Sequence, residues 1–287
     1  MKDSSPSARN DRRLNRALRR FFRAPKGQLI ILLAVLTIVA AIGEGVRQVT
    51  PVLVASVAAA MIVDAPILRV RSGKWKFPDG ALLTGLFVAG ILSPHEPWYV
   101  AAITAVAAVL SKWVARVGHA NVFNPAALGL VATFYIFDTG QSWWGALPDL
   151  PMIAIVLLFA TGVYVARHVG KIPAALTFLG VYYALFTLSA FAGDPAHVAE
   201  VYRAPELHAA LFFAFFMVTD PPTSPPKARD QIVFGVITAV VAYGAFELIG
   251  AAYYLLAGLL AANVWEASRK VSVRRARQRA PHAHAPA

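Results

Sequence analysis

The sequence contains no cysteine and few charged residues. Without cysteine there can be no disulfide, thiolate-held zinc, cysteine-ligated iron–sulfur cluster, thiol nucleophile or covalently attached c-type haem. Only 15% of the 287 residues are charged and 58% are hydrophobic, whereas soluble domains average roughly 25% charged residues. This composition excludes an ordinary soluble domain and indicates a membrane protein, in which any redox chemistry must use a cofactor held without cysteine.

Acidic residues are scarce as well. The chain has 15 of them against 27 Lys and Arg, which gives a net charge of +12. In a soluble protein this excess would suggest nucleic-acid binding, but the basic residues here lie in the gaps between apolar runs. That placement is typical of membrane-topology signals, so we expect the lipid bilayer as a partner and no nucleic acid.

Ten apolar runs account for most of the chain. They cover approximately residues 28–43, 51–68, 80–92, 97–115, 124–137, 150–167, 173–191, 207–219, 231–247 and 250–266. At about 20 residues for each crossing, ten helices would use about 200 of the 287 residues and leave no room for a soluble domain. The sequence therefore predicts a basic cytoplasmic arm at 1–27, a ten-helix membrane domain at 28–268 and a basic, disordered cytoplasmic tail at 269–287.

The basic residues predict the orientation of these helices. If the N-terminus is cytoplasmic, 25 of the 27 Lys and Arg fall on the cytoplasmic side, and only Arg47 and Arg203 lie outside. Cytoplasmic loops are rich in Lys and Arg, and a different number of crossings would scramble this separation. We therefore predict an all-α polytopic protein of the bacterial inner membrane, with ten transmembrane helices and both termini in the cytoplasm.

The third and eighth runs indicate an internal repeat. They align at an offset of 129 residues, which pairs Phe87 with Phe216 and Pro97 with Pro226, and both end in proline-rich turns. Because the two runs would cross in opposite directions, we predict an inverted five-plus-five repeat, with halves at about 28–137 and 150–266. Paired broken segments point to a central binding site, since non-helical backbone in a membrane must be buried by protein or line a polar cavity. The alternative is that these prolines form turns just outside the bilayer.

Three polar residues are candidates for function. Asp64 lies within the second run, where an ionisable group is a functional candidate by default, although nearby Arg69 favours an interfacial position. Asp220 ends the eighth run and could bind a cation or ligand donors, or serve only the turn. Asn124 precedes Pro125, which is typical of a helix N-cap, and the same helix start favours anionic groups such as phosphate.

Two stretches resemble the NqrB/RnfD family. Residues 79–98 together with 123–127 are similar to the first half of that family, and residues 215–225 are similar to its second-half signature. With the ten-run plan, the resemblance covers roughly residues 28–268. It implies a membrane subunit of a flavin-based electron-transport complex of the Rnf or sodium-pumping NADH:quinone oxidoreductase type, coupled to cation movement. Other membrane subunits and a quinone are the partners that it suggests.

The resemblance also implies a flavin. Members of the family carry FMN on a threonine in a stretch of Asp-x-x-Ser-x-Ala-Thr type, in the outer loop after the fifth helix. Here the loop at 138–144 lacks the Ala-Thr ending, and Ser142 is the remaining acceptor candidate. We therefore expect FMN or riboflavin to bind non-covalently near the short helix ends. The candidate cofactor-binding residues are Asn124, Ser142, Thr219, Asp220 and Thr223; no metal site is expected and no catalytic residue is assigned.

Two other functions stay open. A channel, transporter or exporter for a small solute would use the same inverted frame, and a scaffold subunit would need no cofactor. The chain has no Walker loop, His-Glu-x-x-His motif or dinucleotide fingerprint, so neither ATP-driven transport nor NADH oxidation by this chain alone is supported. Whether it is part of an enzyme is left open. We also expect Trp143 and Trp144 to lie in the interfacial aromatic belt.

Overall fold

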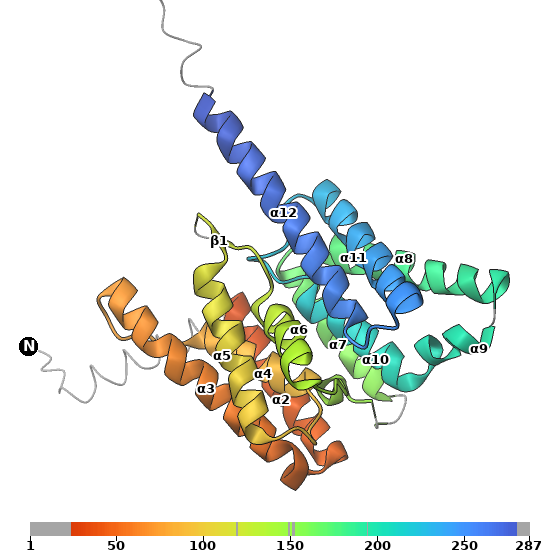
Figure 1. The fold of residues 1–287 in the computed structure, drawn as a ribbon, viewed down its shortest axis with the longest axis horizontal. Helices are drawn as coiled ribbons and strands as arrows, with labels where there is room; N and C mark the ends of the chain where they lie inside the picture. The colour runs from red at the N-terminus through yellow and green to blue at the C-terminus, as the bar shows by residue number, and fades with distance from the viewer. Residues whose placement is uncertain (1–23, 119, 149, 151–152, 194, 280–287) are drawn as a thin grey trace, which may run out of the picture.

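The computed structural model describes residues 24–279 except 119, 149, 151–152 and 194 (Figure 1). Most of the N-terminal arm predicted at 1–27 lies outside these residues. In the first half of the chain, the described residues form five helices and a short β-hairpin. They are α2 (Pro25–Glu44), α3 (Val46–Ser72), α4 (Asp79–Ile91), α5 (Trp98–Val114), β1 (Arg116–Val117), β2 (Ala120–Asn121) and α6 (Pro125–Phe137).

The second half is also helical, and one of its helices changes its winding. The elements are α7 (Ile153–His168), α8 (Ile172–Ala192), α9 (Pro195–Val198), α10 (Ala204–Phe212), α11 (Ala228–Ile249) and α12 (Tyr254–Arg279). Helix α10 continues as a π-helix, η3 (Phe213–Met217). Short 3-10 turns occur at Trp144–Ala146 and Ala199–Tyr202. A π-turn inside a helix is uncommon and often marks a functional site.

Helix length and composition bear out an all-α membrane protein. Among the described residues, 4 helices are long and apolar enough to cross a membrane: α2 from Lys26 onward, α3, α8 and α11. Helices α4, α5, α6, α7 and the segment Ala204–Met217 are apolar but shorter. Within the described residues, each of the ten apolar runs overlaps a helix, but the number of crossings and the sidedness of the termini stay predictions.

The two halves use similar helix neighbours. Helix α3 packs on α5 and α5 on α6, while α8 packs on α11 and α11 on α12. Glycines allow close approach in both halves. A Cβ added to Gly129 of α6 would lie 2.8 Å from the Thr104 carbonyl oxygen and 2.7 Å from Ala108 Cβ of α5. One added to Gly258 of α12 would clash with the carbonyl oxygen of Thr238 in α11. Small residues at such positions let membrane helices pack backbone to backbone.

The tail differs from its prediction. Helix α12 continues to Arg279 and extends beyond the rest of the bundle (Figure 1), so residues 269–279 are helical and not disordered. Arg, Ala and Gln are good helix formers, and Glu266 pairs with both Arg269 and Lys270 across one turn, which supports the helix where it leaves the bundle.

The prediction for the two tryptophans of the outer loop is wrong. Trp143 and Trp144 are only 8% and 1% exposed, because the loop folds back against the end of α4. The indole Nε1 of Trp144 donates to the Ala89 carbonyl at 2.6 Å, and the Trp143 backbone N–H donates to Ile91 O at 3.2 Å. The loop thus satisfies carbonyls that the end of α4 would otherwise leave without partners.

Candidate functional site at the helix breaks

A cavity of about 190 Å³ lies where the starts of α4 and α6 meet the turn after η3. Its volume is below the roughly 300–1,000 Å³ of drug-sized ligand sites, so it suits a small ligand or one flat ring. Its apolar walls include Leu83, Phe87, Val165 and Phe216, and its polar lining includes Asn121, Asn124, Thr219, Asp220, Lys26 and Lys112.

Asn124 holds the start of α6 in place at this cavity. It is 4% exposed, and its Oδ1 accepts a hydrogen bond from the backbone N–H of Ala127 at 3.1 Å, so the predicted N-cap is confirmed. Its own backbone N–H donates to Oδ1 of Asn263 at 2.8 Å. Asn263 Nδ2 in turn donates to the Thr223 carbonyl at 3.4 Å. One amide side chain thereby ties the start of α6 to the proline-rich turn of the other half.

Asp220 lines the same cavity. Its Oδ2 accepts a hydrogen bond from the Thr223 hydroxyl at 2.7 Å. Burial raises the pKa of Asp220 to about 6, although the Thr223 hydrogen bond and the positive charge of Lys171 oppose this rise. Because its pKa is about 6, Asp220 can hold or release a proton near neutral pH. Thr219 also lines the cavity, and its hydroxyl donates to the Phe215 carbonyl.

Two lysines stand at the cavity, each beside a carboxylate. Lys26 pairs with Asp79 at 2.6 Å, and Lys112 pairs with Asp64 at 2.9 Å. Asp64 is 1% exposed and also accepts from Trp113 Nε1 at 2.8 Å. The Asp64 carboxylate is therefore buried in the protein and holds Lys112 toward the cavity; its depth in the bilayer stays a prediction.

The structure brings three of the five predicted cofactor residues to one cavity. Asn124, Thr219 and Asp220 line it, and Thr223 lies behind Asp220 as its hydrogen-bond donor. Ser142 does not belong to this site. Its side chain is exposed, and its backbone N–H donates to Ile91 at the last turn of α4, whereas the cavity is lined by residues of the same helix from Gly80 to Phe87.

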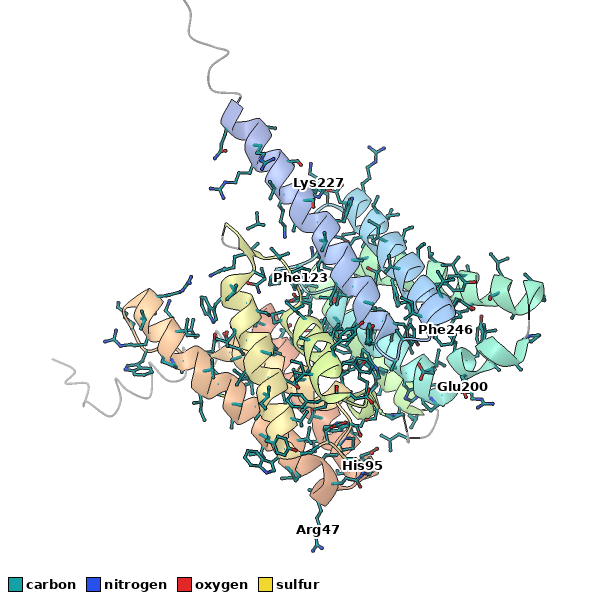
Figure 2. All side chains as sticks on the ribbon, in the orientation of Figure 1. Arg47, His95, Phe123, Glu200, Lys227 and Phe246 are labelled. Atoms are coloured by element: carbon teal, nitrogen blue, oxygen red, sulfur yellow. The ribbon has the colours of Figure 1, made fainter. Side chains whose placement is uncertain are left out.

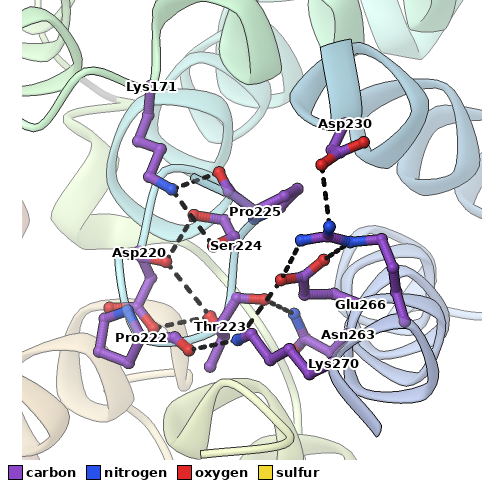
Figure 3. Close-up of polar contacts among 11 residues, drawn as sticks. Lys171, Asp220, Pro222, Thr223, Ser224, Pro225, Asp230, Asn263, Glu266 and Lys270 are labelled. Atoms are coloured by element: carbon purple, nitrogen blue, oxygen red, sulfur yellow. Dashed lines mark hydrogen bonds and ion pairs between the residues drawn. The ribbon is translucent and has the colours of Figure 1, made fainter. Parts of the chain in front are cut away.

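Four polar residues that the sequence did not single out surround the turn (Figure 3): Lys171, Asn263, Glu266 and Lys270. Lys171 appeared to be a cytoplasmic loop charge, yet it is 4% exposed. The other three follow one another at positions i, i+3 and i+7 of α12. That spacing places them on one helix face, and it is the sequence signal that could have identified them.

Comparison with known proteins places the chain in a family. The model of the NQR2, RnfD, RnfE family matches residues 4–152, just over half of the chain. One relative, a subunit of the ion-translocating oxidoreductase complex from Escherichia coli, is 30% identical over 149 residues, which cover 49% of this chain and 39% of that protein. The corresponding Shigella dysenteriae protein is 29% identical over 170 residues, covering 56% and 44%. That of Shewanella loihica is 23% identical over 253 residues, covering 63% and 72%.

The matches to the first two relatives thus span less than half of their length. The family match includes α4 and Asn124, so the first-half motif and the start of α6 both lie within it. The chain belongs to the NQR2, RnfD, RnfE family.

Proposed function

We propose that this chain is a membrane subunit of an Rnf-type electron-transport complex and binds a flavin non-covalently in the cavity at the helix breaks. One observation carries the proposal: the first-half motif and the second-half signature, about 100 residues apart, line one cavity together. Its relatives are named as subunits of an ion-translocating oxidoreductase complex, and these names support the class of complex.

The lining residues suit the ring system of a flavin. Phe87 and Phe216 offer apolar and aromatic surface for its flat faces, and Asn121, Asn124 and Asp220 offer donors and acceptors for its polar edge. The small cavity would take part of the three-ring system, with the rest of the flavin extending toward the opening. A bound flavin would supply one- and two-electron transfer, which no side chain of this cysteine-free protein supplies as readily.

The protein residues have separate tasks in this proposal. Asn124 and Asp220 orient the ligand, and Asn263 fixes the distance between the start of α6 and the turn that carries Asp220. Lys26 and Lys112 place positive charge beside it, each held by a carboxylate. Asp220 can hold or release a proton next to the ligand, since its pKa lies near 6. Coupling to cation movement, a quinone acceptor and further subunits belong to the proposal as well.

We infer further that the chain crosses the membrane ten times as an inverted repeat with both termini in the cytoplasm. Gly129 and Gly258 support the repeat. They are separated by the offset of 129 residues, and each faces a threonine carbonyl on the neighbouring helix with an alanine four residues later. Figure 2 supports the sidedness, because Lys227 and Arg47, which the charge pattern places on opposite sides of the membrane, lie at opposite ends of the bundle.

The test is absorption of the protein purified from membranes, with in-gel fluorescence before and after denaturation. We expect flavin absorbance that is released on denaturation, lost in Asn124→Leu and retained in the control Ser142→Ala. Fluorescence that survives denaturation would contradict non-covalent binding. Absence of flavin from the protein, alone and with co-purifying subunits, would reject the flavin site, and solute flux in liposomes would then test a transporter.

A further inference from the structure

The turn after η3 presents a row of backbone carbonyls to side chains. Residues 220–226 include four prolines, which have no backbone N–H and break the regular pattern of backbone hydrogen bonds. The carbonyls of five successive residues, 222 to 226, accept hydrogen bonds from side chains instead. The donors, in order, are Lys270 at 3.1 Å, Asn263 at 3.4 Å, Lys171 at 3.2 Å, Lys171 again, and Gln231 at 3.3 Å.

Lys171 is the most enclosed charge of this row. It directly precedes α8, and its Nζ donates to the carbonyls of Ser224 and Pro225 (Figure 3). Within the described part of the chain, its hydrogen-bond partners are carbonyl oxygens and not a carboxylate. Burial lowers the pKa of Lys171 to about 8; Glu266 and Asp220 raise it, and Lys270 lowers it further.

Carbonyl oxygens of this kind are cation ligands. In membrane proteins, carbonyls of unwound backbone and of broken helix ends coordinate Na⁺, and rings of carbonyls replace the hydration shell of K⁺. A lysine ammonium is a compact, strongly hydrated point charge, and it satisfies the same oxygens with N–H donors. The carboxylate of Asp220 adds negative charge nearby, as its influence on Lys171 shows.

We propose that the turn at residues 220–226 is a site for a monovalent cation, and that the ammonium group of Lys171 is its built-in occupant. While that group is in place, the carbonyl oxygens accept hydrogen bonds from the protein's own cation, and Na⁺ or K⁺ from solution does not bind. An alkali ion binds when the ammonium is removed or loses its proton. This inference is independent of whether the neighbouring cavity binds a flavin.

The test removes the ammonium nitrogen and keeps an unbranched apolar side chain that is one heavy atom shorter. Lys171→Met is compared with the wild type and with Lys227→Met, an exposed lysine next to the same turn. Thermal unfolding of the full chain is measured in detergent with NaCl, KCl or choline chloride at equal ionic strength. We expect Lys171→Met to have a lower Tm in choline and to regain most of the loss, saturably, in NaCl or KCl. For the wild type, and likewise for Lys227→Met, the Tm should not change between the three salts.

A lysine that serves only as a structural donor would behave differently, since Lys171→Met would then lose the same stability in all three salts. That result would overturn the proposal. If the variant does not accumulate, the wild type provides the second measurement. Above pH 8 the ammonium is increasingly deprotonated, and Na⁺ or K⁺ should then stabilise the protein relative to choline. An equal Tm in the three salts at high pH would refute the built-in cation, whatever the flavin content.

Discussion

The side chain of Asn263 accepts a hydrogen bond from the backbone N–H of Asn124 at 2.8 Å, although the two residues are 139 positions apart. The N–H at a helix start has no partner within its helix, so α12 supplies the partner for α6. Because the same amide reaches the Thr223 carbonyl, one side chain sets the spacing between two walls of the cavity.

Removing this amide should loosen both walls. Asn263→Leu leaves the Asn124 N–H and the Thr223 carbonyl without their partner, and we expect a loss of about 1–3 kcal/mol for each unsatisfied buried group, together with weaker retention of any flavin. Asn263→Asp keeps the acceptor and loses the donor, so it should be less damaging. Denaturation in detergent measures both, with Ser272→Ala at the exposed end of α12 as control. Equal stability of Asn263→Leu and the wild type would contradict the role of the amide.

The pair of Asp64 and Lys112 should behave as a buried ion pair. Replacing Asp64 by Leu leaves the ammonium of Lys112, only 16% exposed, without its carboxylate, and removing one partner of a buried pair costs about 3–5 kcal/mol. The double variant Asp64→Leu with Lys112→Met should be more stable than Asp64→Leu alone. The matched control is Asp79→Asn, because the pair of Lys26 and Asp79 is about half exposed and such pairs contribute at most about 1 kcal/mol. Thermal unfolding of the four proteins decides between these outcomes.

Stability should fall as pH rises through the titration range of Asp220. Its pKa is raised from 3.8 to about 6 by burial, so between these values the folded protein binds more protons than the unfolded chain, and the free energy of unfolding decreases with pH. A shift of this size corresponds to at most about 3 kcal/mol. Asp220→Asn does not titrate. The Tm of this variant minus that of the wild type should therefore increase between pH 4 and about 6 and stay constant at higher pH. A constant difference across the whole range would rule out the raised pKa.

The absence of cysteine makes the orientation directly testable. Single cysteines at two exposed serines, Ser142→Cys in the outer loop and Ser272→Cys near the end of α12, would be the only thiols in the chain. With a membrane-impermeant maleimide, we expect Ser142→Cys to react in intact spheroplasts and Ser272→Cys to react only after permeabilisation. Reaction of both on the same side would contradict an odd number of crossings between these sites, and the reverse pattern would contradict cytoplasmic termini.

Local patterns in the sequence determined the helices and the places where they break. Apolar runs, proline-rich ends and the Asn124-Pro125 cap depend on neighbours within a few residues, so they could be predicted without tertiary information. The same patterns carried the family resemblance, which the family match confirms.

Only the tertiary structure decided which candidates share a site. Ser142 and Asn124 were both candidates in the sequence, but Ser142 contacts the last turn of α4, whereas Asn124 lines the cavity beside the earlier turns of that helix. Lys171 counts as a loop charge in any local reading, yet it is buried against carbonyls 53 and 54 positions away. The physical reason is that hydropathy and capping are local properties, whereas the partner of a buried charge or amide is set by helix packing between distant parts of the chain.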